Sequence, residues 1–140
     1  MRSSLILVFL FLASCGGKTT SFKMGHTTRS EVVAIKGEPL KEEEIPGPEG
    51  KVMIYENDEK YQLKGDIVVH RFKNPIGDEK LLLFWKHKLK DCTTNSKKLP
   101  VNLGAHTPPE IELSCPEEGL SVIYTEGSDS VSRVVEYEAK

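Results

Sequence analysis

The sequence predicts an α+β fold, in which one short N-terminal helix packs on a mainly antiparallel sheet of about five or six strands. Two observations predict it. One capped apolar segment near residue 30 has helical spacing, and most of the chain after residue 50 consists of short alternating runs separated by turn residues. The chain has 140 residues with 19 basic and 21 acidic side chains, which fits one small domain. A nucleic-acid partner is not expected, because it requires a concentrated basic face.

The first residues have the pattern of a secretory signal peptide. Arg2 precedes an apolar run from Leu5 to Leu12, and this run is too short to cross a bilayer. The chain therefore divides into a signal peptide at residues 1–14, a flexible tether at 15–21 and a single α+β domain at 22–140.

The ending Leu12-Ala13-Ser14-Cys15 resembles the bacterial lipobox, in which the cysteine is acylated and becomes the first mature residue. This resemblance implies lipidation of Cys15 and a membrane contact through the N-terminal lipid. An ordinary secretory signal cleaved near Cys15 is the alternative. Gly16 does not carry the aspartate-type signal for retention in the inner membrane, which favours the outer membrane.

The other two cysteines form an even pair. Cys92 and Cys115 each end a strand-like run, and an oxidising periplasm favours a disulfide between them. Two buried free thiols are the alternative. A catalytic thiol is less favoured, because no histidine lies near either cysteine in the sequence.

The predicted helix follows Thr28, which begins a capping-box pattern that is completed by Glu31. Val32 and its apolar neighbours give the helix a side to bury. Gly37 is placed to end the helix, and Pro39 prevents it from restarting.

The remaining chain predicts strands separated by turns. Residues 40–50 are charged and rich in proline and glycine, so they predict a loop, and their acidic run Glu42–Glu44 is interpreted as solvated charge. Strands are expected at residues 52–55, 61–63, 67–72, 81–90 and 111–115, and residues 120–124 and 131–137 are expected to form a C-terminal hairpin.

The segment 81–90 carries the main surface hypothesis. Strand alternation places Trp85 with Leu81, Leu83 and Leu89 on a buried face. The opposite face would hold Phe84, Lys86, Lys88 and Lys90. An aromatic ring beside lysines suits anionic lipid headgroups or an acidic partner, so this is a candidate contact face.

No catalytic motif is found. The four histidines, His26, His70, His87 and His106, have no metal-ligand spacing, although His70 and His87 become neighbours if their strands pair, which leaves a transition-metal site as an alternative. No catalytic residue, cofactor or metal is therefore assigned, and a non-enzymatic protein is expected.

The helix region resembles a known family. Residues Gly25-His26-Thr27-Thr28-Arg29-Ser30-Glu31-Val32, followed by Gly37-Glu38-Pro39, are similar to the "Gly-x-Thr … Val … Leu-Gly-x-Pro" signature of the SmpA/OmlA (BamE-like) lipoproteins. Lys36 stands where that family usually has leucine, and the spacing from Gly25 to Val32 is one residue longer than the commonest form. The motif residues carried over are Gly25, Thr27, Thr28, Glu31, Val32, Gly37 and Pro39.

The resemblance implies a non-enzymatic lipoprotein on the periplasmic side of the outer membrane that binds a protein partner in the envelope and assists outer-membrane protein assembly. A related α+β layout occurs in the β-lactamase inhibitor proteins, which contain two tandem copies of the unit, whereas the sequence shows one copy here. An inhibitor-like or small-ligand-binding lipoprotein that shares only the fold is the alternative function.

Overall fold

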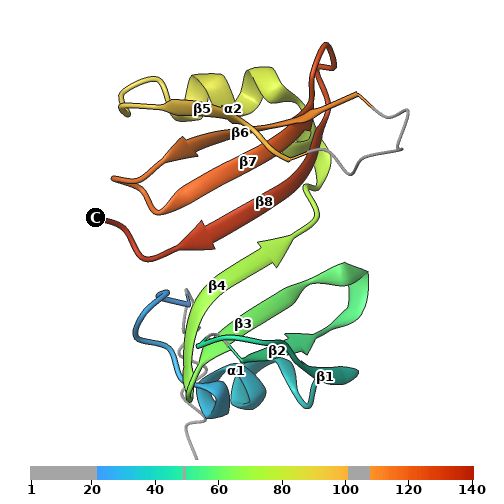
Figure 1. Cartoon of the computed structure of the whole chain (residues 1–140), viewed down its shortest axis with the longest axis vertical. Helices are drawn as coiled ribbons and strands as arrows, with labels where there is room; N and C mark the ends of the chain where they lie inside the picture. The colour runs from blue at the N-terminus through green and yellow to red at the C-terminus, as the bar shows by residue number, and fades with distance from the viewer. Residues whose placement is uncertain (1–21, 49, 101–107) are drawn as a thin grey trace, which may run out of the picture.

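The computed structural model describes residues 22–48, 50–100 and 108–140, which form one eight-stranded antiparallel sheet with two α-helices (Figure 1). The strands lie in the order β1-β2-β3-β4-β8-β7-β6-β5. The expected single helix on about five or six strands is therefore wrong, because a second helix and two further edge strands are present. No helix in the described ranges is long and apolar enough to cross a membrane.

The first half of the chain contains one helix followed by a four-stranded meander, which we call unit 1. Its elements are α1 (Arg29–Lys36), β1 (Lys41–Glu44), β2 (Lys51–Ile54), β3 (Lys60–Lys64) and β4 (Ile67–Lys73), with a 3-10 turn, η1 (Glu56–Asp58), between β2 and β3. The predicted capping box is confirmed, since the Thr28 hydroxyl accepts from the Glu31 N–H and the Thr28 N–H donates to the Glu31 carboxylate. The helix ends at Gly37, whose φ of 83° favours glycine.

The second half, which we call unit 2, repeats this order. Its elements are a 3-10 turn, η2 (Gly77–Lys80), then α2 (Leu82–Lys88), β5 (Asn95–Lys98), β6 (Glu110–Cys115), β7 (Leu120–Thr125) and β8 (Val131–Tyr137). The predicted C-terminal hairpin is confirmed, because β7 and β8 pair antiparallel.

Matching backbone contacts show that the two units are built alike. The residue before each helix, Thr28 or Leu81, forms an antiparallel bridge to the start of its unit's last strand, at Ile67 or Ser130. The first N–H of α1, at Arg29, donates to the Asp66 carbonyl at 2.9 Å, and the first N–H of α2, at Leu82, donates to the Asp129 carbonyl at 2.8 Å. The register also shifts between the third and fourth strands of each unit, at residues 62/63 and 123/124. The expectation of a single copy is therefore wrong.

Both helices cover the same face of the sheet. In unit 1, Val32 packs in a buried cluster with Met53, Tyr61, Leu63 and Val68, and in unit 2 Leu82 and Trp85 pack with Val122, Val131 and Val134. Residues that lie opposite one another in adjacent strands share a face of the sheet. One such row contains Tyr61 of the first cluster, then Arg71 and Glu136, and then Leu120, which packs on the second cluster, so both clusters lie on one face. The opposite face carries no helix, and we call it the helix-free face.

The strand expected at residues 81–90 is wrong, because this segment forms α2. Leu82, Trp85 and Leu89 are buried at helical spacing, whereas Leu83 is 75% exposed. Trp85 is a core residue, as expected, with 1% of its surface exposed. The loop expected at residues 40–50 is also wrong in part, because Lys41–Glu44 pairs with β2 as the edge strand β1.

Candidate functional site

The two units meet where β4 pairs with β8, between residues 70–73 and 134–137. On the helix-covered side of this junction lies a connected set of charges, which we call the ion-pair network. Its members are Lys36, Glu59, Arg71, Lys73, Glu79 and Glu136. The network therefore links α1, the residue after η1 and β4 of unit 1 to η2 and β8 of unit 2.

Arg71 is the centre of the ion-pair network. Its guanidinium lies 2.8 Å from a Glu59 carboxylate oxygen and 3.1 Å from one of Glu136. Lys36 also pairs with Glu59, and the Tyr61 hydroxyl donates to Glu59 at 2.6 Å. These carboxylates are partly buried, with 13% of the Glu59 side chain and 28% of the Glu136 side chain exposed.

The surroundings shift the pKa values of this cluster. Burial alone would raise the pKa of Glu59, but hydrogen bonds from Lys36, Tyr61 and Arg71 outweigh it, so the pKa lies below its usual range. Burial raises the pKa of Tyr61, and its hydrogen bond to the Glu59 carboxylate raises it further. For Arg71, burial opposes the charged form, yet the adjacent Glu136 and Glu59 carboxylates leave the pKa raised. The Glu59 carboxylate and the Arg71 guanidinium are therefore charged at neutral pH.

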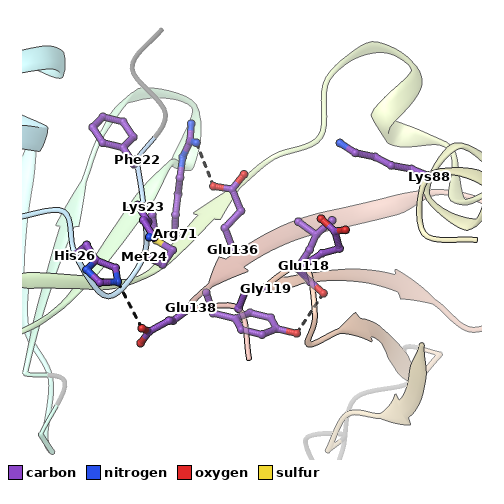
Figure 2. A pocket seen from close by; sticks show the side chains of 13 residues that line it. Phe22, Lys23, Met24, His26, Arg71, Lys88, Glu118, Gly119, Glu136 and Glu138 are labelled. Carbon is purple, nitrogen blue, oxygen red and sulfur yellow. Dashed lines mark hydrogen bonds and ion pairs between the residues drawn. The ribbon is translucent and has the colours of Figure 1, made fainter. Parts of the chain in front are cut away.

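A groove of about 630 Å³ opens beside the network, between the two units (Figure 2). One wall is the segment that leads into α1, the other contains the turn between β6 and β7 and the end of β8, and Lys88 of α2 completes it. Figure 2 shows His26 and Glu138 pointing toward one another across this groove, with 3.7 Å between Nε2 and the carboxylate. The lining residues are Phe22, Lys23, Met24, His26, Arg71, Lys88, Glu118, Gly119, Leu120, Glu136, Tyr137, Glu138 and Ala139.

The groove is lined by charged groups of both signs. Its floor holds the Arg71–Glu136 ion pair, and its rim carries both Lys23 and Glu118. Among its lining residues we find no nucleophile aligned with a base. The arrangement suits the binding of a polar segment of another molecule.

The helix-free face is a second candidate surface. Register places Phe72, Val135 and Ser121 in one row and His70 and Tyr137 in the next. A hollow of about 250 Å³ lies on this side, lined by Ile45, Val52, Asp58, Lys60, Gln62, Phe72 and Arg133. His70 Nδ1 and Ser121 Oγ are buried without a hydrogen-bond partner in the part of the chain that the structure describes.

The predicted disulfide is confirmed. Cys92 lies just after α2 and Cys115 ends β6, and a disulfide joins them with 6.0 Å between the Cα atoms. Among the described residues, the only group of three donors with metal-like spacing is this pair with Glu117, and the two sulfur atoms are bonded to each other. Cys15 lies outside the described residues.

The predicted contact face of residues 84–90 is not a strand face, so its premise is wrong. On α2, Phe84 is half-buried against the unit 2 core and Lys86 is exposed, and Lys90 is exposed in the turn that follows the helix. Lys88 Nζ lies over the rings of Trp85 and Phe84, at 5.0 and 5.9 Å from their centres. The lysines therefore surround a helix, and one of them packs on its aromatic residues.

The histidines and the motif residues have separate places. His26 lines the groove, His70 lies in β4 on the helix-free face, and His87 is exposed on α2, which covers the opposite face, so the structure does not bring His70 and His87 together. His106 lies outside the described residues.

The motif around Gly25 fastens the start of α1 to the sheet. The Gly25 N–H donates to the Val68 carbonyl at 2.8 Å, and the Thr27 hydroxyl accepts from the Lys23 N–H at 2.8 Å. Val32 is completely buried, and Pro39 lies between the helix end and β1. These residues therefore support the fold, and the groove begins beside them.

The ion-pair network was not predicted from the sequence. Arg71 and Glu136 are 65 positions apart, and no spacing rule relates them. Only the pairing of β4 with β8 makes them neighbours.

No family model, no curated protein and no solved structure matches this chain. The fold and the candidate site therefore define only a class, a duplicated α+β domain with one helix-covered and one helix-free face.

Proposed function

We propose that this protein is a non-enzymatic, lipid-anchored envelope protein that binds another envelope protein through its helix-free face. The observation that carries the proposal is the position of both helices on one side of the eight-stranded sheet. The lipobox at Leu12–Cys15 supports the anchor, and the motif from Gly25 to Pro39 supports a place at the outer membrane. Outer-membrane assembly machinery is the partner that this motif favours.

The size of the helix-free face suits a protein partner. Eight strands spaced about 4.8 Å apart, each several residues long at about 3.3 Å per residue, present roughly 600 Å². A stable protein interface buries about 800 Å² on each side, so most of one interface fits here. A small ligand would not need so wide a surface.

The chemistry of this face also suits a protein partner. Phe72 and Arg133 lie near its centre, on the two middle strands, and arginine is enriched among the residues that dominate binding energies. Charged side chains surround them, with Glu43 on β1 and Glu112 on β6. The face therefore combines an aromatic ring and an arginine at its centre with charged side chains around them.

An inhibitor-like binder is the second candidate function. The observation that favours it is the internal repeat, since two tandem copies of the unit are also the layout of the β-lactamase inhibitor proteins, which this chain resembles in layout alone. Both candidates use a sheet face for binding, and they differ in the partner that is recovered.

The test is a mild crosslinking pull-down of the full chain from its native envelope, with partners identified by mass spectrometry. We expect Phe72→Ala combined with Arg133→Ala to reduce recovery of the partner by at least about tenfold, since truncating central interface residues often costs 2 kcal/mol or more. Leu83→Ala is the matched control, because Leu83 is 75% exposed on the helix-covered side. Thermal unfolding checks that all three chains remain folded.

Each outcome separates the candidates. Barrel-assembly proteins among the lost partners would support the envelope-assembly function, and an enzyme recovered in their place would support the inhibitor-like function. Equal recovery by the wild type and the Phe72/Arg133 variant would contradict binding through the helix-free face. Cys15→Ser tests the anchor separately, and we expect it to abolish incorporation of labelled palmitate.

A further inference from the structure

The two edges of the sheet carry opposite charge. β1 has one lysine and three glutamates, whereas β5 has two lysines and no acidic residue, and every residue of both strands is exposed. Figure 1 shows these strands at opposite ends of the sheet. Within the described ranges, neither strand has a neighbour on its outer side.

Both edges direct free backbone groups outward. The Ile45 N–H donates to the Gly50 carbonyl at 3.0 Å, so the backbone of Ile45 bonds toward β2. Bonding toward and away from the neighbour alternates along an antiparallel strand, and Glu42 and Glu44 therefore direct their backbone groups away from β2. On the other edge the Leu99 N–H donates to the Glu110 carbonyl at 2.9 Å, so the backbone groups of Ser96 and Lys98 point away from β6.

One register joins these edges with charge and backbone complementarity together. Adjacent strands are antiparallel throughout the sheet, so β1 and β5 run in opposite directions, and a second copy in the same orientation brings its β5 antiparallel to β1. Glu42 and Lys98 both belong to the helix-covered face, and Glu43 and Lys97 both belong to the helix-free face. Placing Glu42 opposite Lys98 therefore places Glu43 opposite Lys97, with the outward backbone groups of the two strands facing each other.

We propose that β1 of one molecule pairs with β5 of a second copy, so that the sheet continues from one chain to the next. Contacts between two like edges bring net like charge together, which disfavours a symmetric dimer. A head-to-tail contact of this kind leaves one edge free on each end molecule, so it repeats from copy to copy until the rotation between copies closes a ring.

The contact is weak for an isolated pair of molecules. Each strand has only four residues, Glu42 already pairs with Arg29, and Lys98 lies 2.8 Å from Glu126. Exposed ion pairs contribute little individually, so the association depends on a high local concentration, such as that of molecules held on one membrane.

The contact at a membrane rests on the proposed lipid anchor, so the experiment is zero-length carbodiimide crosslinking of the lipidated full chain, reconstituted at high density in vesicles of a neutral phospholipid, at low and high salt, using a mixture of ¹⁴N- and ¹⁵N-labelled protein. A carbodiimide joins a lysine to a carboxylate that touches it, and mixed-isotope peptides identify bonds between molecules. We expect bonds between residues 42–44 and residues 97–98, and a lower yield at high salt because salt screens exposed charges.

Charge exchange tests the register. Lys97→Glu with Lys98→Glu, or Glu43→Lys with Glu44→Lys, gives both edges the same sign. Each pair also removes groups that the carbodiimide joins, so energy transfer between dye-labelled copies measures the association of these chains, and we expect each pair to reduce it about tenfold. All four substitutions in one chain restore opposite edges, and we expect the association to recover. Lys86→Glu with Lys90→Glu is the control, because it makes the same charge change at two exposed positions away from both edges, one in α2 and one in the turn after it.

The outcomes are decisive in both directions. Edge pairing would be established if each two-residue variant lost association between copies and the four-substitution chain recovered it. The proposal would be overturned if the wild type gave no mixed-isotope bonds between residues 42–44 and 97–98. It would also be overturned if the Lys86/Lys90 control reduced association as strongly as the edge substitutions do. Circular dichroism excludes unfolding as the cause of any loss.

Discussion

Arg71 acts at the scale of a single residue as the link between the two units. It lies on the last strand of unit 1 and contacts Glu136 of unit 2 while it also holds Glu59 of its own unit. Removing the guanidinium leaves two partly buried carboxylates with fewer partners, and an unpaired buried charge costs more than the pair itself contributes. Arg71 is therefore a residue at which a single change affects both units.

We expect Arg71→Met to lower the free energy of unfolding by about 2 kcal/mol at pH 7. The folded-state pKa of Glu59 is lowered, so its contribution is present above the unfolded pKa of about 4.3 and is lost as the pH falls through the lower folded-state pKa. The difference between the variant and the wild type should therefore shrink below about pH 4. Urea unfolding across pH 3–7 measures it.

Arg133→Met is the control for this experiment. Its ion pair with Glu110 is at the surface, with 45% and 41% of the two side chains exposed, and we expect a loss of at most about 0.5 kcal/mol. The role given to the network would be contradicted if Arg71→Met and Arg133→Met lowered the free energy of unfolding equally. It would also be contradicted if the effect of Arg71→Met did not change with pH.

At the scale of elements, the two units hold their helix to the sheet by different means. In unit 1 the Tyr55 hydroxyl donates to the Gly37 carbonyl at the end of α1, at 2.9 Å. Cys115 is the residue of unit 2 that corresponds to Tyr55, because Leu113 pairs with Val122 in the way that Met53 pairs with Tyr61. Cys115 forms the disulfide to Cys92, which follows α2. One hydrogen bond and one covalent bond thus occupy equivalent places.

We expect Tyr55→Phe to destabilise the protein by about 1 kcal/mol, because the substitution removes a partly buried hydrogen bond and leaves the ring in place. Tyr124→Phe is the matched control, since the Tyr124 hydroxyl makes no hydrogen bond among the described residues. Thermal unfolding of both variants at pH 7 provides the comparison, and equal effects would contradict a specific tie between Tyr55 and α1.

Loss of the disulfide should have a larger effect. The bonded cysteines are separated by 23 positions, and the chain-entropy model gives about 3 kcal/mol for a loop of this size. We expect Cys115→Ser, or reduction with dithiothreitol, to lower the free energy of unfolding by that amount in urea titrations. Cys15→Ser should leave the value unchanged, and a wild type that is insensitive to reductant would disprove the contribution.

The sequence predicts those elements whose signals are local. The capping box at Thr28 and Glu31 marks the start of α1, and alternation over residues 120–137 marks the last hairpin. It does not identify α2, because Trp85 and Leu89 satisfy both alternation and helical spacing. The edge strands were missed because their exposed, charged residues carry no burial pattern.

At the scale of the whole molecule, the repeat is visible in the backbone and almost absent from the sequence. Equivalent register positions are filled by Val32 and Trp85 in the helices, and by Arg71 and Val134 in the last strands. Because each pair differs in size or polarity, the apolar pattern of one unit does not predict that of the other. The ion-pair network lies at the junction, where unit 1 has Arg71 at the position that the apolar Val134 fills in unit 2.

The divergence of the units has a consequence for valency. On the helix-free face, the positions filled by His70 and Phe72 in unit 1 are filled by Arg133 and Val135 in unit 2. A duplicated surface with identical halves would offer two equivalent docking places, whereas these halves differ in charge and shape. We therefore expect one asymmetric partner to span both halves at a ratio of one partner per chain. The mass of the isolated complex measures this ratio, and a ratio of two would mean that each half binds a partner by itself.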